Sequence, residues 1–366
     1  MGLSMAVEIG RKNDVRIPLV YALHSGNLYG TERMALATVE GLADRFDPVI
    51  FAPPGKALEA AERLGFAVRP FESPFQFAAG LRPFLAQNRK LAFVATGVAH
   101  SLCCIALNAL YRRKISHLHV VHGGADEALS YGRKRRLNAF HVTYVAVSEF
   151  VKARLIAHGV PDERIVVVEN FLPASRIFDA PRRGPYDAAG IRNALIVSRV
   201  DPIKRIDLLL DAIDRTPALN AMSFRILGTG WDLDTLRARA AERNPNVTFV
   251  GFSPDVPDAL AEADLLVHLC PAEPFGLAIL EAMAADVPVL APDTGGAGSL
   301  VEEGVSGFRF RADDADDLAA RLIALSVAPS DVLNRAVAGG RRALEGRFSA
   351  LARTGDYRRL LMEGMG

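Results

Sequence analysis

The feature that most constrains the fold is a regular alternation of short apolar runs with longer segments of helical periodicity. In the first half of the 366-residue chain, IPLVYALHS (17–25) precedes a helix expected over 31–44, and DPVIFAPP (47–54) precedes one ended by Gly65. Such alternation predicts a parallel sheet covered by helices on both faces. The further runs read as strands are AVRPF, LAFVATG, SHLHVVHG, VTYVAVS, RIVVVEN, NALIVSRV, MSFRILG, NVTFVGF, DLLVHLC and VPVLAP.

The alternation is interrupted once, between Phe171 and Arg192, by a stretch with Pro and Gly and without periodicity. Such a stretch is typical of a linker. We therefore predict an N-terminal doubly wound domain over 15–172, a linker over 173–190 and a C-terminal doubly wound domain over 191–349. Ligands of open α/β sheets bind at the carboxyl ends of the strands, so the expected site is the cleft between the two domains.

Composition limits the classes of function. The net charge is +1, which gives no general argument for nucleic-acid binding. The three cysteines form no CxxC pair, so we expect reduced thiols and no metal site. No apolar run reaches the roughly 18–20 residues that a membrane helix needs. Residues 1–16 resemble a loose leader rather than a signal peptide, and the expected location is the cytoplasm.

Two glutamates stand out in the segment EPFGLAILEAMA. Glu273 precedes Pro274 and lies just before an expected helix, where free N–H groups and the helix dipole favour an anion. Glu281 is expected about one and a half turns into the helix, and eight residues rise by about 12 Å. This separation suits the two ends of a sugar nucleotide. The alternative is a helix-capping carboxylate with an ordinary solvated glutamate.

Two cations follow the first strand of the second half, in VSRVDPIKRID. Arg199 ends the strand, and Lys204 follows an Asp-Pro turn. A planar guanidinium and a point-charge ammonium at the end of a sheet can hold a diphosphate. They can also stabilise the negative charge that grows on the diphosphate as it leaves. A solvated basic loop is the alternative.

The first half offers a small-residue turn and several histidines. Gly30, in LYGTERMAL, lies between a strand and a helix, where backbone N–H groups can approach a ligand, although the segment is no G-x-G-x-x-G. His122, in LHVVHGG, lies at the carboxyl end of a strand and is expected to face the cleft. We interpret His119 as a core residue or one behind the site, and His100 as a weaker cleft candidate.

These motifs resemble the retaining glycosyltransferase family 4, which has the GT-B fold and an E-x7-E signature. The similarity extends over most of the chain in the expected order. It implies that Glu273 orients the donor sugar, Glu281 binds the ribose, Arg199 and Lys204 hold the diphosphate, and His122 lies beside the donor sugar. It also implies that 350–366 cross back onto the first domain. Further donor-binding positions implied by the resemblance are Gly30, Gly228, Gly230, Phe252, Phe275, Gly276 and Leu277.

The chain departs from the family pattern at two places. The loop at Gly30 matches a Gly-Gly-x-Glu-Arg loop at Gly30 and Glu32, but Tyr29 replaces the first glycine. Gly298 and Ser299 replace a usual Pro-Glu pair. The effect of either departure does not follow from the sequence.

The resemblance implies a retaining, metal-independent hexosyltransferase without a protein nucleophile, in which the leaving phosphate takes the proton of the acceptor. The expected donor is a UDP- or GDP-sugar, with no cofactor, and the leading expected role is cell-surface polysaccharide or lipopolysaccharide synthesis. Alternatives are tailoring of a small metabolite, a sugar-nucleotide 2-epimerase and a non-catalytic binding module of the same fold.

Two basic runs in the first half, 112–114 and 133–136, have two interpretations. They are either solvated helix faces or contacts for an anionic acceptor or a phospholipid surface.

Overall fold

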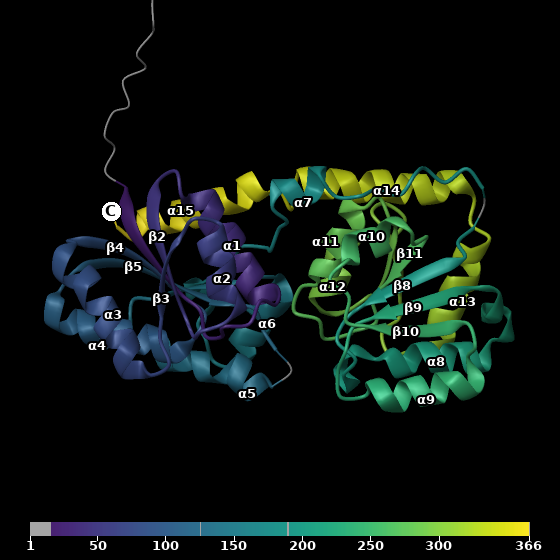
Figure 1. Ribbon diagram of the computed structural model, residues 1–366, viewed down its shortest axis with the longest axis horizontal. Coiled ribbons are helices and arrows are strands. Elements are labelled where there is room, and N and C mark those ends of the chain that lie inside the picture. The colour runs from purple at the N-terminus through teal and green to yellow at the C-terminus, as the bar shows by residue number, and fades with distance from the viewer. Residues whose placement is uncertain (1–15, 125, 189, 366) are drawn as a thin grey trace, which may run out of the picture.

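The computed structural model describes residues 16–124, 126–188 and 190–365, so nearly all of the leader expected at 1–16 lies outside the described residues. The described chain forms two α/β domains that lie side by side (Figure 1). Among the described helices, none is both long and apolar enough to cross a bilayer.

The N-terminal domain is built on a seven-stranded parallel sheet in the order β3-β2-β1-β4-β5-β6-β7. The strand order reverses between β1 and β4, and a crevice forms outside the carboxyl ends of the strands at such a point. The bounds are β1 Ile17–Ala22, β2 Phe46–Ala52, β3 Ala67–Pro70, β4 Lys90–Ala95, β5 Lys114–Val121, β6 Thr143–Ala146 and β7 Ile165–Val167.

The C-terminal domain is built on a six-stranded parallel sheet in the order β10-β9-β8-β11-β12-β13. The bounds are β8 Asn193–Val197, β9 Ser223–Leu227, β10 Val247–Gly251, β11 Leu265–Val267, β12 Val289–Pro292 and β13 Phe308–Phe310. We did not predict β13, because Phe308 and Phe310 alternate with arginines and form no continuous apolar run. It pairs with β12 at the edge of the sheet.

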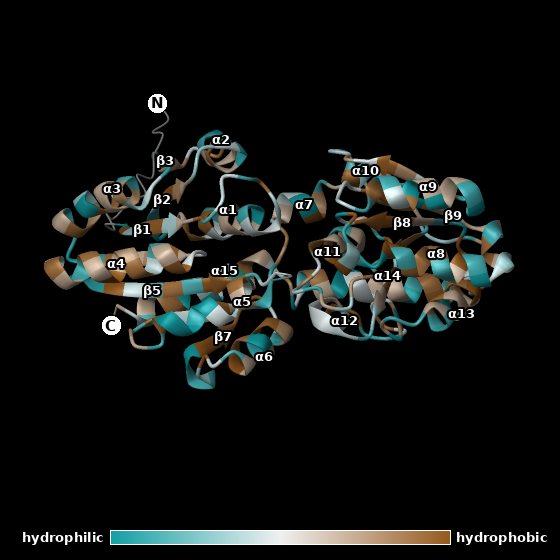
Figure 2. Cartoon of the chain, turned by 90° about the horizontal axis from the view of Figure 1, so that it is seen from below, coloured by the Kyte–Doolittle hydropathy of each residue, from teal (hydrophilic) through white to brown (hydrophobic). Residues whose placement is uncertain are grey.

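Helices cover both sheets, as the alternation predicts. Figure 2 shows that strands such as β5 and β8 are mainly hydrophobic, whereas the helices around them also carry hydrophilic residues. The helices of the first half are α1 Gly30–Leu42, α2 Lys56–Arg63, α3 Pro74–Gln87, α4 Val98–Tyr111, α5 Glu127–Ser130 and α6 Glu149–Ala157. Those of the second half are α8 Ile206–Arg215, α9 Leu233–Arg243, α10 Val256–Ala261, α11 Leu277–Ala284, α12 Gly295–Leu300, α13 Ala315–Ser326, α14 Ser330–Glu345 and α15 Ala350–Glu363.

Two segments connect the domains. The stretch expected as a linker contains one short helix, α7 (Ala174–Phe178). The last two helices return along the same side of the molecule, shown in yellow in Figure 1, and α15 packs on α1 and β5. Arg358 donates to the carbonyl of Gly41 (3.2 Å) and to Asp44 (2.7 Å). The C-terminal helix therefore completes the core of the N-terminal domain.

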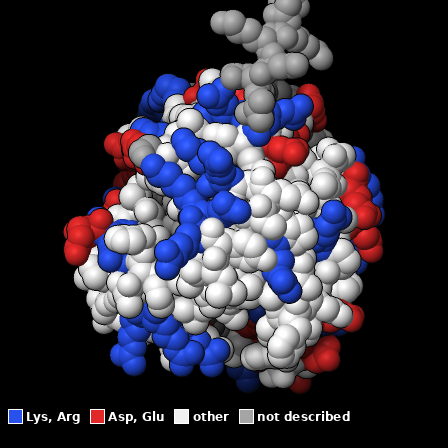
Figure 3. All heavy atoms as spheres, turned by 90° about the vertical axis from the view of Figure 1, so that its left-hand side faces the viewer, with Lys and Arg blue, Asp and Glu red and all other residues white. Residues whose placement is uncertain are grey.

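The two basic runs lie at opposite ends of the strands of the N-terminal sheet, and neither is the face of an α-helix. Arg112 follows α4 with φ +51°. Arg113, just before β5, donates to the carbonyls of Leu85 (2.7 Å) and Ala86 (3.1 Å) in α3. Figure 3 shows Lys and Arg side chains gathered on that outer end of the domain. The run 133–136 belongs to a 3₁₀ helix (Gly132–Leu137) near the carboxyl ends of the strands. The two runs therefore cannot act as one surface.

We expect Leu361→Ala, in α15, to lower the free energy of unfolding of the N-terminal domain by about 2–5 kcal/mol, because it leaves a cavity in the core. Leu361 is fully buried, whereas Leu351 in the same helix is 79% exposed. Leu351→Ala is the matched control, with an expected change within about 0.5 kcal/mol. Denaturant unfolding followed by circular dichroism measures both. Equal effects would mean that α15 does not form part of this core.

Candidate functional site

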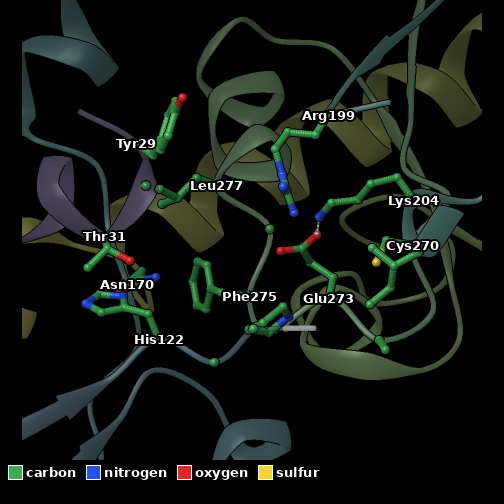
Figure 4. Close-up of a pocket in the computed structure, with 17 residues that line it drawn as sticks. Tyr29, Thr31, His122, Asn170, Arg199, Lys204, Cys270, Glu273, Phe275 and Leu277 are labelled. Atoms are coloured by element: carbon green, nitrogen blue, oxygen red, sulfur yellow. Dashed lines mark hydrogen bonds and ion pairs between the residues drawn. The ribbon is translucent and has the colours of Figure 1, made fainter. Parts of the chain in front are cut away.

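The candidate site is a pocket of about 300 Å³ at the carboxyl ends of both sheets, with walls from both domains (Figure 4). The N-terminal domain contributes the loop at the start of α1 and the loop after β5. The C-terminal domain contributes the loops after β8 and β11 and the start of α11. The lining residues predicted from the sequence are Gly30, His122, Arg199, Lys204, Glu273, Phe275, Gly276 and Leu277.

The centre of the pocket is an ion pair between Lys204 and Glu273. Lys204 Nζ lies 2.6 Å from Glu273 Oε2, and both side chains are only 15% exposed. Burial alone would disfavour the charge on Glu273, but contact with His268 and the charge of Lys204 outweigh burial and hold the pKa of this carboxyl well below its usual value. Burial likewise opposes the charge on Lys204, and Glu273 reverses the effect, so the pKa of Lys204 is raised. Both groups are therefore charged at neutral pH.

Glycines hold the backbone that carries Glu273. The N–H of Gly296, in the first turn of α12, donates to the carbonyl of Glu273 (2.7 Å). A Cβ on Gly296 would lie 2.1 Å from the carbonyl oxygen of Pro274, and one on Gly298 would lie 2.8 Å from that of Pro292. Gly298, at the departure from the family pattern, therefore permits close packing of α12. Its neighbour Ser299 caps this turn by donating to the carbonyl of Gly296 (2.7 Å).

Arg199 lies at the edge of the pocket and points toward Lys204 and Glu273 in Figure 4. It is 62% exposed and pairs with the buried Asp201 at 2.7 Å. Gly228 and Gly230 do not line the pocket. A Cβ on Gly228 would lie 1.8 Å from the carbonyl oxygen of Ser198, and Gly230 is packed in the same way on Val200. In this structure the two glycines shape the loop that carries Arg199.

Glu281 does not line this pocket, and its expected contact with the ribose stays a prediction. The helix begins at Leu277, so Glu281 is one turn into it rather than one and a half. Leu277 separates the pocket from a neighbouring cavity that Glu281 lines. There Glu281 pairs with Arg176 of α7 at 3.2 Å. Burial raises the pKa of Glu281, with partial compensation by Arg176 and Arg33.

The residues around Gly30 close the pocket from the N-terminal domain. A Cβ on Gly30 would lie 3.3 Å from Leu277 Cδ1, so the two domains nearly touch here. Tyr29, the departure from the family loop, is 68% exposed and precedes α1. Glu32 is buried and accepts from the backbone N–H of Tyr29 (3.0 Å), which makes it a helix-capping residue.

His122 follows β5 and faces the pocket beside Thr31 and Asn170 (Figure 4). Its Nε2 is shielded from solvent and has no hydrogen-bond partner among the described residues. Burial and the nearby His24 lower the pKa of His122 to about 3, so the ring is neutral at neutral pH. A neutral imidazole can donate to or accept from a sugar hydroxyl.

The other histidines and Phe252 lie elsewhere. His119 is fully buried and bonds to Ser101 Oγ (3.0 Å), which confirms that it is a core residue. His100 lines a second cavity beside the pocket. Phe252 is 76% exposed after β10 and does not line the pocket.

The sequence reasoning missed several residues of the site. His268 lies two residues before Cys270, and its Nε2 is 3.5 Å from Glu273 Oε2. His268 directly follows the strand β11, a neighbour of β8, and this position could have identified it from the sequence. Thr31 gave no signal beyond its position in the Gly30 loop. Among the described residues, no group of three or more His, Cys, Asp or Glu side chains is arranged to hold a metal ion.

Two sequence families match the chain. Residues 28–176 match Glycosyltransferase Family 4, and residues 191–340 match Glycosyl transferases group 1. A lipopolysaccharide core biosynthesis glycosyltransferase of Rhizobium meliloti is 29% identical over 54% of this chain and 57% of its own length. A GDP-mannose-dependent alpha-mannosyltransferase of Mycobacterium tuberculosis is 32% identical over 46% of this chain and 43% of its own. The chain thus spans about half the length of these relatives.

Solved structures share the fold. The Anabaena protein HepE in complex with UDP and glucose has a TM-score of 0.79, with 20% identity, over 95% of this chain and all of that one. The lipopolysaccharide outer core galactosyltransferase WaaB has a TM-score of 0.74, with 15% identity, over 95% of this chain and 99% of its own. At these identities the likeness concerns the fold.

We expect Lys204→Met to lower the free energy of unfolding by about 3 kcal/mol, because it leaves Glu273 without its counter-charge in a shielded place. Arg335→Ala, which breaks an exposed pair with Asp331 on α14, should cost less than about 1 kcal/mol. Denaturant unfolding at pH 7 compares the two variants with the wild type. An effect of Lys204→Met no larger than that of Arg335→Ala would contradict the role of the pair.

The same pair predicts a pH dependence. Because the folded pKa of Glu273 lies below its usual value of 4.5, the stabilisation is complete above that pH and is lost as pH falls toward the folded pKa. The difference in melting temperature between wild type and Lys204→Met should therefore be largest near pH 7 and shrink below pH 4.5. A difference that stays constant from pH 7 to pH 3 would argue against an ionised Glu273.

Proposed function

The chain belongs to glycosyltransferase family 4 and has the GT-B fold, and on that premise we propose that it transfers a hexose-type sugar from a nucleotide-diphosphate sugar to an acceptor hydroxyl with retention of configuration. The observation that carries the proposal is the ion pair between Lys204 and Glu273 in a cleft walled by both domains. It combines a cation for phosphate and a carboxylate for hydroxyls within one pocket.

Lys204 and Arg199 are assigned to the diphosphate. An ammonium has three donors, so Lys204 can keep its bond to Glu273 and still donate to a phosphate oxygen. Arg199 is exposed at the mouth of the same pocket. The backbone N–H groups at the start of α11, near Gly276 and Leu277, add the positive end of a helix dipole. Positive charge at this place stabilises the diphosphate as it leaves, and no metal ion is part of the proposal.

Glu273 and His122 are assigned to the donor sugar. The carboxylate of Glu273 can accept from sugar hydroxyls, and His122 offers a neutral ring from the opposite wall. In the proposed step the bond between the anomeric carbon and the diphosphate oxygen breaks, the acceptor oxygen bonds to that carbon on the same face, and the acceptor proton passes to the diphosphate. This step needs no general base from the protein.

The remaining donor contacts stay predictions. Glu281 could bind the ribose only by sharing its carboxylate with Arg176 or by leaving it. Gly228, Gly230 and Phe252 lie around the carboxyl ends of β9 and β10, beside the loop of Arg199.

We place the reaction in cell-surface polysaccharide or lipopolysaccharide assembly in the cytoplasm, with UDP or GDP as the nucleotide. Support comes from a relative of the lipopolysaccharide core pathway, a GDP-mannose-dependent relative, and UDP in HepE. The basic outer end of the N-terminal domain in Figure 3 is a surface for peripheral contact with anionic lipid.

The test is release of nucleoside diphosphate from UDP-, GDP- and ADP-sugars, with and without candidate acceptors. A transferase releases nucleoside diphosphate in step with glycosylated product, and nuclear magnetic resonance of the product anomer reports retention. An epimerase would convert the donor without acceptor, and a binding module would bind nucleotide without releasing product.

We expect Glu273→Gln and Arg199→Met to lower kcat/KM by about 100-fold or more, because each removes charge that acts on the donor. Arg335→Ala, far from the pocket on α14, should leave turnover unchanged. Arg199 is exposed, so its variant separates loss of catalysis from loss of folding. Wild-type turnover in both site variants would contradict the proposal.

A further inference from the structure

We propose that a second cavity, next to the donor pocket, is the acceptor subsite and that it selects an acceptor carrying an anionic group, a phosphate or a carboxylate. The inference rests on the proposed function, because it names the substrate class of the second half of the same cleft. The cavity measures about 570 Å³, within the range of about 300–1,000 Å³ that is usual for small-molecule sites.

The position of the cavity suits an acceptor. It lies over the carboxyl ends of β1, β4 and β5, where the strand order of the N-terminal sheet reverses. It shares Thr31, His122 and Gly123 with the donor pocket, so the two spaces meet at His122. A molecule in this cavity can therefore present a hydroxyl to the anomeric carbon of a sugar held beside Glu273.

The cavity carries positive charge without a counter-charge. Lys134 and Arg133 line it, and no described lining residue is Asp or Glu. Among the described residues, the nearby charge that affects the pKa of Lys134 comes from Arg133 rather than from a carboxylate. Lys134 is only 9% exposed, and its Nζ donates to the carbonyl of Leu129 (3.2 Å). A buried cation without a counter-charge is costly, and a bound anion would remove that cost.

The chain holds Lys134 in place. Tyr144 is fully buried, and its hydroxyl donates to the backbone carbonyl of Lys134 (2.9 Å). Burial, with a smaller contribution from Arg133, lowers the pKa of Lys134 to about 8. The ammonium is thus a fixed feature of the cavity wall rather than a mobile surface charge.

The start of α4 points to the same ligand chemistry. Gly97, Val98 and Ala99 line the cavity, and α4 has 14 residues. Its N-cap is Gly97, which provides no side-chain cap, and its first turn has no acidic residue. The free N–H groups and the positive end of the dipole therefore face a cavity that already contains a cation, and both favour an anion.

Polar groups suited to hydroxyls complete the wall. His24 Nδ1 lies 2.9 Å from Thr96 Oγ1, and both residues line the cavity. Nδ1 of His100 is shielded from solvent and has no hydrogen-bond partner among the described residues. An anion at Lys134 and α4 would leave the hydroxyls of the same molecule near these groups and near His122.

The experiment measures binding of three sugars that differ only at carbon 6, namely glucose, glucuronate and glucose 6-phosphate. Isothermal titration calorimetry is run with saturating UDP or GDP, so that phosphate cannot occupy Lys204 and Arg199. We expect glucuronate or glucose 6-phosphate to bind at least about tenfold more tightly than glucose. Tighter binding of glucuronate would identify the anion as a carboxylate, and tighter binding of glucose 6-phosphate would identify it as a phosphate. Inorganic phosphate added alone reports binding of the anion without a sugar.

The variants are Lys134→Met and Arg133→Gln, with Arg135→Gln/Arg136→Gln as the matched control. All four residues lie in one 3₁₀ helix, but Arg135 and Arg136 are exposed and do not line the cavity. We expect both cavity variants to lose the preference for the charged sugar by about tenfold and the control to retain it. Arg133 is exposed, so Arg133→Gln keeps the test decisive if Lys134→Met does not fold.

The failure of this inference differs from failure of the proposed function. No preference for either charged sugar, or an equal loss in the control, would overturn the anionic acceptor subsite while nucleotide release remained intact. Binding of a charged sugar that depends on Lys134, in a protein without sugar transfer, would uphold the subsite and overturn the transferase.

Discussion

The ion pair between Lys204 and Glu273 is the interaction on which the site depends. Two charges that are each only 15% exposed would be unfavourable separately, and together they satisfy each other. The pair joins the loop after β8 to the loop after β11, and these strands are neighbours in the sheet. It therefore holds two opposite charges in place at the carboxyl ends of these strands before any ligand binds.

The backbone near that pair is held from both domains. Ser148 Oγ, at the start of α6 in the N-terminal domain, donates to the carbonyl of Pro274 (2.6 Å), and Gly296 of the C-terminal domain holds Glu273. Gly123 has φ +77°, and a Cβ there would lie 2.5 Å from Tyr131 Oη and 2.8 Å from Pro274 Cγ. Small residues at these points let the domains approach closely around the cleft.

Much of the fold could be predicted because each strand and helix carries its own period. The strands from IPLVYALHS to VPVLAP form as expected, and Gly65 follows α2 with φ +82°. Two elements were missed. The strand β13 alternates Phe with Arg and forms no continuous apolar run, and α7 has only five residues, too few for a helical period. The position of Glu273, Lys204 and His122 in one cleft could be predicted, because ligands of open parallel sheets bind at the carboxyl ends of the strands.

The sequence by itself determined most of the elements, their division into two domains with parallel sheets and the residue types that the cleft presents. Only the tertiary structure decided which partners those residues have. Glu281 pairs with Arg176 of the linker, and Glu32 caps α1. Lys134 is buried beside the start of α4, whereas Arg135 and Arg136 are exposed. The reason is that periodicity reports which side of an element is apolar, whereas the charge of a group and its partner depend on contacts between residues far apart in the chain.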